Sequence, residues 1–264
     1  MTEQNISLTI DGQAVTVPKE TTILEAARSV GIDIPTLCWA ENLTPVNVCR
    51  LCVVEADNSK ALVPACSRAC DAGSNIETSN ERVTKNRRMV LELLDSANDL
   101  SQSEELQVLM ANYEADSSRY SDNLAAHDES KIEDDLFIRA YDRCVLCYKC
   151  VQACGEEAQF TFAIAIANRG FDARVSTEHD IPLPESACVY CGNCIGGCPT
   201  NALQFKTEFD LRSAANWRPE DQEVTETICS YCGVGCTLEL HTQDNEIVKV
   251  TSPADHSVTS GHLC

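Results

Sequence analysis

The sequence predicts an α+β fold divided among several small domains, three of which are organised around groups of cysteines. Alternating apolar residues near the N-terminus predict a β-hairpin followed by a helix, and apolar residues at helical spacing predict two more helices in the middle of the chain. Seventeen cysteines occur in 264 residues, and short strands are predicted beside the later groups. We therefore expect domains at residues 1–79, 80–135, 136–208 and 209–264.

The composition limits the explanations for so many cysteines. The N-terminus has no basic or long apolar stretch, and no segment reaches the roughly 20 apolar residues that span a bilayer, so we expect a cytoplasmic protein without membrane insertion. Disulfides are rare in that compartment, and an odd number of cysteines fits them poorly. Zinc or iron–sulfur centres remain. The net charge of −21 disfavours nucleic acid and anionic membranes as partners.

The first domain begins with a strand–turn–strand pattern. Apolar and polar residues alternate over 6–17, and Asp11-Gly12 in the middle predicts a tight turn. Thr22 and Glu25 form a capping-box pattern before an amphipathic helix predicted over 23–30. A hairpin followed by a helix is how a β-grasp domain begins.

Four cysteines follow with the spacing C-x10-C-x2-C-x13-C, namely Cys38, Cys49, Cys52 and Cys66. After this hairpin and helix, the spacing resembles the [2Fe–2S] domain at the N-terminus of the large iron–sulfur subunit of respiratory complex I and of related hydrogenases and formate dehydrogenases. The resemblance implies that these four thiolates hold one [2Fe–2S] cluster. Zinc is the alternative for any four cysteines. Cys70 fits no quartet, and we expect it to be a buried or spare thiol.

The middle segment is predicted to be a helical spacer with two helices and a polar, acidic loop over 115–133. Proteins that resemble the first domain usually continue here with a His-x3-Cys-x2-Cys-x5-Cys cluster. No cysteine lies between Cys70 and Cys144, and His127 stands alone in a polar stretch, so we expect this cluster to be absent. The first helix is predicted from an apolar stripe of Val83, Met89, Val90, Leu93 and Leu94, and the second from Leu106, Leu109, Met110 and Tyr113.

The third segment contains the C-x2-C-x2-C-x3-C run twice, which is the run that binds [4Fe–4S] clusters in bacterial-type ferredoxins. Zinc gives no reason for eight cysteines at these intervals. Pro199 follows the second run as in such ferredoxins, whereas Gly155 follows the first and leaves the local turn open. The insert between the runs is predicted to form a strand pair over 160–167 and 171–175. Because the fourth cysteine of each run ligates the other cluster in two-cluster ferredoxins, we assign one cluster to Cys144, Cys147, Cys150 and Cys198, and the other to Cys188, Cys191, Cys194 and Cys154.

The last segment is predicted to be a linker over 210–226 and a small β-rich lobe with strands over 238–241 and 247–250. The spacing C-x2-C-x3-C-x27-C resembles the first [4Fe–4S] lobe of molybdopterin oxidoreductases, notably formate dehydrogenases. The resemblance implies one more [4Fe–4S] cluster. Zinc in a ribbon-like lobe is the alternative for the first three cysteines. The four residues are Cys229, Cys232, Cys236 and Cys264.

The order of these parts resembles the N-terminus of the large subunit of cytoplasmic molybdenum- or tungsten-dependent formate dehydrogenases. The resemblance implies electron transfer through one [2Fe–2S] and three [4Fe–4S] clusters between formate or CO2 and NAD or a soluble carrier. The family continues after the residue matching Cys264, so we expect the bis-pterin metal, every catalytic residue and the substrate site to lie outside this chain, in a pterin-binding chain or domain. A flavin subunit that reduces NAD, or a soluble carrier, is the other expected partner.

The alternative is a non-catalytic electron-transfer subunit of a hydrogenase or a complex I-like assembly. Iron hydrogenases share the first three parts, but the lobe that begins at Cys229 argues against them. A complex I subunit shares the first domain and the last lobe, but it would not be expected to carry the ferredoxin pair.

Overall fold

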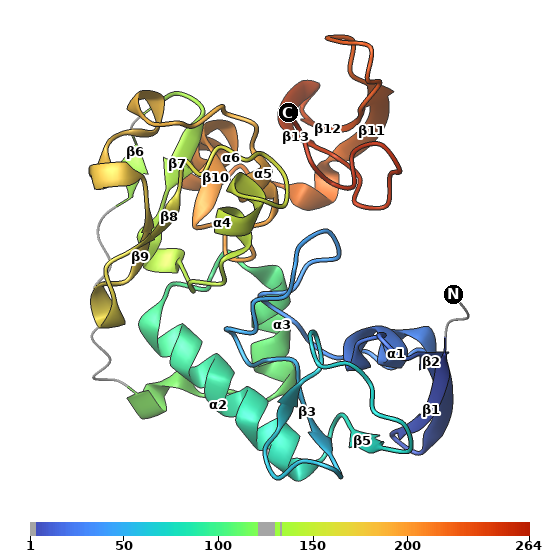
Figure 1. The fold of residues 1–264 in the computed structure, drawn as a ribbon. Coiled ribbons are helices and arrows are strands. Elements are labelled where there is room, and N and C mark those ends of the chain that lie inside the picture. Colours follow the sequence, from blue (N-terminus) through green and yellow to red (C-terminus); the bar gives the residue numbers. More distant parts are fainter. Residues whose placement is uncertain (1–3, 121–129, 133) are drawn as a thin grey trace. The chain divides into compact units, whose positions relative to one another are not determined.

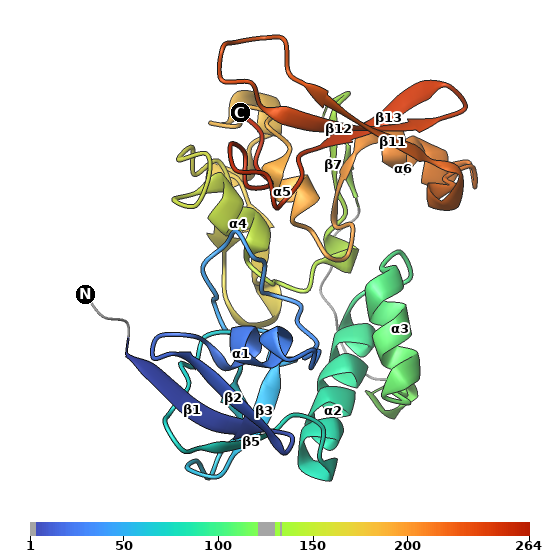
Figure 2. The same cartoon turned by 90° about the vertical axis from the view of Figure 1, so that its right-hand side faces the viewer.

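The computed structural model describes residues 4–120, 130–132 and 134–264, and the chain divides into two compact units (Figure 1, Figure 2). One unit comprises residues 1–39 and 45–124, and the other comprises 40–44 and 125–264. His127, which the sequence places in a polar loop, lies outside the described residues. Among the described residues, no helix combines the length and hydrophobicity that crossing a bilayer requires.

The first unit is built on a five-stranded sheet with the order β2-β1-β5-β3-β4. The predicted hairpin is confirmed, because β1 and β2 pair antiparallel with Leu8 opposite Val15, and β1 also pairs in parallel with β5. Side chains of α1 pack with those of the sheet in one apolar core. The elements are β1 (Asn5–Ile10), β2 (Gln13–Pro18), α1 (Ile23–Ser29), β3 (Val53–Ala56), β4 (Val63–Pro64) and β5 (Asn75–Glu77).

The start of α1 has the predicted capping box. The Glu25 backbone N–H donates to Thr22 Oγ1 at 3.2 Å, and the Thr22 backbone N–H donates to Glu25 Oε2 at 2.8 Å. Two N–H groups at the helix end, which have no partner within the helix, are thereby satisfied. The cap fixes where α1 begins.

Two helices and a short 3-10 turn complete the first unit: α2 (Glu81–Ala97), α3 (Glu104–Asn112) and η1 (Ser117–Tyr120). Both predicted helices are present, but the apolar stripe from which α2 was predicted is only partly buried. Met89 and Leu93 are 42% and 44% exposed. The buried positions are instead Val83, Arg87 and Leu91, spaced four residues apart and so on one helix face, together with Glu92. The apolar pattern does not reveal this face, because a charged residue, Arg87, lies at its centre between Val83 and Leu91.

The ferredoxin-type part of the second unit contains two small sheets and two short helices. One sheet has the order β10-β7-β6, and the other pairs β8 with β9. The predicted strand pair of the insert is confirmed but shorter, because Phe160 and Phe162 adopt left-handed backbone conformations that interrupt a strand. The elements are β6 (Lys131–Ile132), β7 (Phe137–Arg139), η2 (Tyr141–Arg143), α4 (Lys149–Cys154), β8 (Ala165–Ala167), η3 (Gly170–Asp172), β9 (Arg174–Ser176), η4 (Glu178–Asp180), η5 (Leu183–Glu185), α5 (Asn193–Gly196) and β10 (Leu203–Phe205).

The C-terminal part of the second unit is a three-stranded sheet in the order β11-β12-β13, preceded by a helix. Its elements are α6 (Lys206–Ser213), η6 (Pro219–Asp221), β11 (Glu223–Ile228), β12 (Thr237–Gln243) and β13 (Glu246–Thr251). The two predicted strands are confirmed as β12 and β13, each with wider bounds.

The linker predicted over 210–226 is wrong at both ends. Its beginning belongs to α6, where the ion pairs Lys206–Asp210 and Arg212–Glu208 join residues four apart on one helix face. Its end belongs to β11, an edge strand whose six residues are all exposed and which pairs through its backbone with β12. A fully exposed strand has no apolar alternation, so its polarity suggested a loop.

Candidate metal centres

The first cysteine quartet is assembled by loops around β3 and β4. Cys38 lies in the loop after α1, Cys49 and Cys52 precede β3, and Cys66 follows β4. The structure brings all four thiols together: Cys38 is hydrogen-bonded to Cys49, Cys52 to Cys66, and Cys66 is within electrostatic range of the other three. In each pair, the hydrogen bond between the two thiols shifts their pKa values in opposite directions. It lowers the pKa of Cys49 to about 6 and that of Cys52 to about 7, and it raises the pKa of Cys38 and that of Cys66. Two of the four thiols are thus poised as thiolates, the form that binds metal.

A buried arginine from α2, Arg87, is hydrogen-bonded to the backbone on both sides of Cys52. Arg87 is 2% exposed, and it donates from Nε to the Leu51 carbonyl and from Nη2 to the Val53 carbonyl, each at 3.0 Å. The two carbonyls flank Cys52, and the Leu51 N–H itself lies 3.5 Å from Cys49 Sγ. Sequence reasoning missed this residue. Its signal was the spacing of four that places it between Val83 and Leu91.

The two ferredoxin-type runs enclose two cavities in one shared core. Each cavity is lined by three cysteines of one run and the fourth cysteine of the other, and Leu203 lines both. The crossed grouping of the sequence analysis is therefore the grouping in space. One cavity is lined by Cys144, Cys147, Cys150 and Cys198, and the other by Cys154, Cys188, Cys191 and Cys194.

Burial dominates the electrostatics of these thiols. It raises the pKa of Cys144 to about 11 and of Cys147 to about 12, and it raises the pKa of Cys150, Cys188, Cys191 and Cys194 in the same direction. An apolar environment disfavours a bare thiolate, so a cationic centre is needed to hold these residues in the ionised form.

The two runs repeat one local geometry. Leu146 and the corresponding Tyr190 have left-handed backbones, as do Tyr148 and the corresponding Gly192. These turns aim backbone N–H groups at the sulfurs: the Tyr190 N–H lies 3.5 Å from Cys188 Sγ, and Cys144 receives the same contact from Leu146. N–H groups directed at thiolate sulfurs are the contacts that tune an iron–sulfur cluster.

Gly155 explains why the first run lacks the proline that follows the second. It closes α4, and its N–H donates to the carbonyls of Val151 and Gln152 at 2.9 and 3.0 Å. Proline has no N–H and would lose both bonds. An ideal Cβ on Gly155 would also approach the Phe162 ring to 3.1 Å.

The C-terminal quartet is the least enclosed of the four. The loop between β11 and β12 is closed by a 2.8 Å hydrogen bond from the Cys229 N–H to the Cys236 carbonyl, with a left-handed turn at Gly235. Cys232 and Cys264 are exposed. Within the described part of the chain, no hydrogen bond joins either of their thiols to another cysteine. The structure thus brings Cys229 and Cys236 together, and hydrogen bonds to the neighbouring Leu263 anchor the backbone beside Cys264.

The two ferredoxin-type donor sets fit clusters of several irons. Within residues 4–120, 130–132 and 134–264, no three His, Cys, Asp or Glu side chains are placed to bind one metal ion. An iron–sulfur cluster distributes its thiolates over several iron atoms, so it needs four thiols around a cavity. The two ferredoxin-type cavities offer that arrangement.

Cys70, the cysteine outside the quartets, is buried as predicted. It is 4% exposed within the core of the first unit, and burial raises its pKa to about 11. A protonated, enclosed thiol is unreactive.

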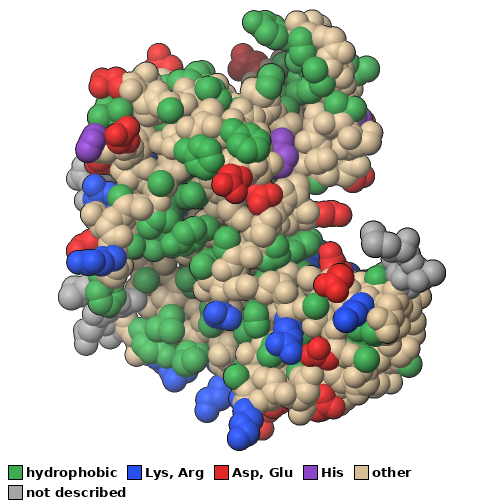
Figure 3. All heavy atoms as spheres, in the orientation of Figure 1, with side chains coloured by type: hydrophobic (Ala, Val, Ile, Leu, Met, Phe, Trp, Pro, Cys, Tyr) green, Lys and Arg blue, Asp and Glu red, His purple; other side chains and the backbone are tan. Residues whose placement is uncertain are grey.

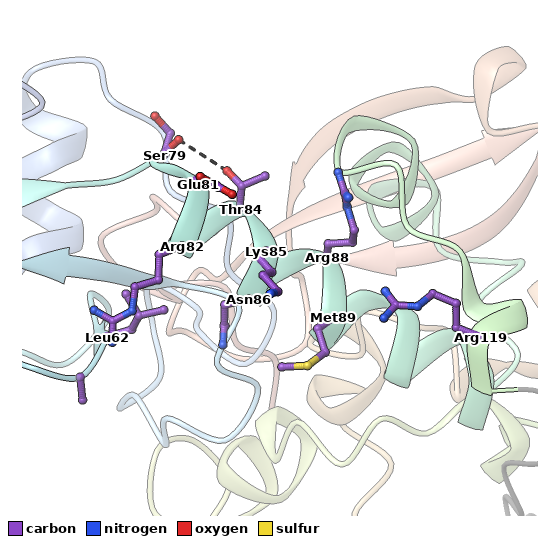
Figure 4. A pocket seen from close by; sticks show the side chains of 11 residues that line it. Leu62, Ser79, Glu81, Arg82, Thr84, Lys85, Asn86, Arg88, Met89 and Arg119 are labelled. Carbon is purple, nitrogen blue, oxygen red and sulfur yellow. Dashed lines mark hydrogen bonds between the residues drawn. The ribbon is translucent and has the colours of Figure 1, made fainter.

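A groove of about 790 Å³ follows the exposed face of α2, and its lining contains no cysteine (Figure 4). Four cationic side chains line it. Arg82 pairs with Glu55 at 2.6 Å and Arg119 with the buried carboxylate of Glu92 at 2.8 Å, so much of the charge is already compensated. The other two are Lys85 and Arg88.

Three protein-family models match the chain. A 2Fe-2S iron-sulfur cluster binding domain matches residues 3–81, a 4Fe-4S binding domain matches 181–204, and a molybdopterin oxidoreductase Fe4S4 domain matches 222–264. The matched residues include the first quartet, the second ferredoxin-type run and the last quartet.

Curated relatives match almost the whole chain. It is 35% identical over 269 residues to NADPH-Fe(3+) oxidoreductase subunit alpha of Geobacter sulfurreducens and 33% identical over 267 residues to a subunit of NADH-quinone oxidoreductase from Rhizobium meliloti. It is 28% identical over 307 residues to a Staphylococcus aureus protein provisionally named as a formate dehydrogenase. These alignments cover 97–98% of the chain but only 30% of each relative.

A solved structure agrees with this grouping. A chain of the NAD+-reducing [NiFe]-hydrogenase in the H2-reduced state superposes with a TM-score of 0.63 and 25% identity, over 76% of this chain and 87% of that one. This chain is thus a mixed α/β protein with iron–sulfur cluster binding domains, and over almost its whole length it is similar to the iron–sulfur regions of NADH-quinone oxidoreductase-like subunits and of molybdopterin oxidoreductases.

Proposed function

We propose that the chain conducts electrons through one [2Fe–2S] and three [4Fe–4S] clusters held by its four cysteine quartets. The observation that carries the proposal is the crossed lining of the two ferredoxin-type cavities, each with four thiols in an apolar shell. Bound clusters supply one-electron carriers whose potentials depend on the surrounding hydrogen bonds and burial. The [2Fe–2S] ligands are Cys38, Cys49, Cys52 and Cys66; the [4Fe–4S] ligands are Cys144, Cys147, Cys150 and Cys198, then Cys188, Cys191, Cys194 and Cys154, then Cys229, Cys232, Cys236 and Cys264.

The protein's own residues have three tasks in this function. Thiolates bind the iron, and backbone N–H groups such as those of Leu51 and Tyr190 direct hydrogen bonds at their sulfurs. Apolar side chains, among them Phe137, Ile195 and Leu203, keep water from the ferredoxin-type pair. Crossed ligation makes the pair one folding unit, which keeps the two centres close.

The finer proposal is a place in a molybdenum- or tungsten-dependent formate dehydrogenase. Formate oxidation at a pterin-bound metal outside this chain releases two electrons and a proton. The C-terminal lobe would receive the electrons singly, and the first unit would deliver them to a flavin subunit that reduces NAD, or to a soluble carrier. We infer that no catalytic residue lies in this chain.

The surface of the C-terminal lobe supports a large partner there. Ile228, Tyr231 and Val234, in and beside the cysteine loop, are 68%, 92% and 62% exposed. Figure 3 shows hydrophobic side chains on the surface of this lobe. Such a patch beside a metal centre is suited to burial against a pterin-binding chain or domain.

A second candidate is an NAD(P)H-linked oxidoreductase or hydrogenase assembly that does not use formate. The relatives named for NADPH and NADH oxidation are 35% and 33% identical, above the 28% of the formate dehydrogenase relative. The chain would then transfer electrons from a nicotinamide-oxidising subunit to another acceptor.

Metal analysis tests the shared proposal. The anaerobically reconstituted chain should bind about 14 iron atoms with acid-labile sulfide. About four zinc ions and no iron would overturn it. Bleaching of the cluster absorbance in the native complex separates the two candidates: reduction by formate supports the first, whereas reduction only by NADPH, NADH or H2 supports the second. A co-purifying pterin-binding chain is expected for the first.

A further inference from the structure

The backbone N–H and carbonyl of Leu263 are both hydrogen-bonded to the side chain of a buried asparagine, Asn193. Asn193 Oδ1 accepts a hydrogen bond from the Leu263 N–H at 2.7 Å, and Asn193 Nδ2 donates one to the Leu263 carbonyl at 2.9 Å. The C-terminal end of the chain lies beside α5, which begins at Asn193 (Figure 1, Figure 2). The side-chain amide therefore satisfies both polar groups of one residue 70 positions away.

Asn193 belongs to the cysteine loop of the ferredoxin-type core. It lies between Cys191 and Cys194, its backbone N–H points at the Cys191 sulfur, and it is 8% exposed. The corresponding residue of the first run is Lys149, which has no acceptor in its side chain. The two-sided contact is thus specific to the second run.

A second side-chain amide, that of Gln159, is also hydrogen-bonded to the backbone of Leu263. Gln159 Nε2 also donates to the Leu263 carbonyl. Gln159 follows Cys154, a member of the same proposed quartet as Cys191. The Leu263 carbonyl therefore accepts two bonds, whereas the Leu263 N–H depends on Asn193 alone.

We propose that Asn193 is a positioning residue that holds Cys264 against the ferredoxin-type core and so fixes the spacing for electron transfer between the two centres. The proposal rests on the proposed function. Cys264 directly follows Leu263, so the two hydrogen bonds between Asn193 and Leu263 hold the backbone beside its thiol. A continuous chain of covalent and hydrogen bonds runs from Cys191 through Asn193 and Leu263 to Cys264. Since electron transfer weakens steeply with distance, a contact that fixes this distance also keeps the transfer rate from varying.

Hydrogen exchange at the Leu263 amide tests the contact without relying on activity. Asn193→Ala should raise the exchange rate of that amide by about tenfold or more, because its acceptor is lost. Asn193→Asp keeps an acceptor for the N–H but turns a carboxylate toward the carbonyl, so its effect should be intermediate. Gln159→Ala is the matched control, and it should leave the Leu263 N–H protected. Unchanged exchange in Asn193→Ala would overturn the proposal.

A spectroscopic readout tests the role in spacing. In the reduced, reconstituted full chain, the magnetic interaction between the C-terminal centre and the ferredoxin-type pair should weaken in Asn193→Ala and stay in Gln159→Ala. An unchanged interaction alongside faster exchange would overturn the positioning role. Metal analysis of the same samples distinguishes failure of this proposal from failure of the proposed function. A chain that binds no iron contradicts the proposed function, whatever the exchange rate of its Leu263 amide.

Discussion

Arg87 donates a 3.0 Å hydrogen bond from Nε to the carbonyl oxygen of Leu51, the residue directly before Cys52 in the first cysteine loop. The same guanidinium reaches the Val53 carbonyl at 3.0 Å and the Tyr113 hydroxyl at 2.9 Å. A helix outside the predicted first domain therefore supports the backbone on both sides of Cys52. Because one side chain joins the two elements, we expect the helix and the loop to lose their order together.

Arg87→Met should destabilise the first unit by about 2–4 kcal/mol, because it leaves two buried carbonyls without a charged donor. Arg87→Lys should destabilise the first unit by less than Arg87→Met, because the ammonium keeps a charged donor but cannot bond both carbonyl oxygens as a planar guanidinium does. Urea unfolding of the full chain, followed by circular dichroism, measures the effect. Lys85→Ala, at an exposed position of the same helix, is the control. Equal transitions for Arg87→Met and Lys85→Ala would contradict the bracing role.

Gly192→Ala should cost about 1–3 kcal/mol and reduce iron occupancy. The backbone at Gly192 is left-handed, with φ of +79°, and an added Cβ would approach Phe205 Cζ to 3.2 Å. Gly196→Ala, at the end of α5, is the matched control, because its Cβ would meet nothing within 4 Å. Thermal unfolding and iron content of both variants give the comparison. A similar loss in both would show that conformation at Gly192 is not the cause.

Cys198→Ala should damage the centre that contains Cys144 and spare the one that contains Cys191. Cys198 lines the cavity of the first set, although it belongs to the second run. Paramagnetic resonance of the reduced variant should lose the signal of one [4Fe–4S] cluster, and Cys154→Ala should lose the other. If Cys198→Ala removed only the signal that Cys191→Ala removes, the crossed assignment would fail.

Cys70 should make the free energy of unfolding fall between about pH 9 and pH 11. Burial, with smaller effects from Asp71 and Glu25, raises its pKa from 9.0 to about 11 in the folded chain. Below pH 9 the thiol is protonated in both states and has no effect on the pH dependence. Above pH 9 the unfolded thiol ionises while the folded one does not, so folding loses stability.

Cys70→Ala removes that contribution, so its unfolding midpoint should decline less than that of the wild type from pH 8.5 to pH 10.5. Parallel declines would contradict the role of the buried thiol. With native protein at pH 8, a thiol reagent should leave Cys70 unmodified, and denaturation should expose it.

Local features of this fold could be predicted from sequence because they depend on neighbours in the chain. The turn at Asp11-Gly12 and the cap at Thr22 and Glu25 lie where the pattern placed them. The exposed strand β11 could not be predicted, because its stability comes from backbone pairing with β12 and not from apolar side chains. The buried face of α2 was missed for a related reason, since the partners of Arg87 are carbonyls that only folding brings near.

The sequence by itself determined the four groups of cysteines and the spacing within each run, because spacing within a short loop is a property of the local chain. The crossed assignment was a prediction from the likeness to two-cluster ferredoxins. Only the tertiary structure decided which residues support these groups from a distance. Arg87 lies 36 residues from Leu51, and Asn193 lies 70 from Leu263. Each satisfies a backbone group through its side chain, and such a contact leaves no periodic mark in the sequence. The physical reason is that a backbone carbonyl or N–H can pair with any side-chain donor or acceptor of suitable geometry, so folding, and not residue order, selects the partner.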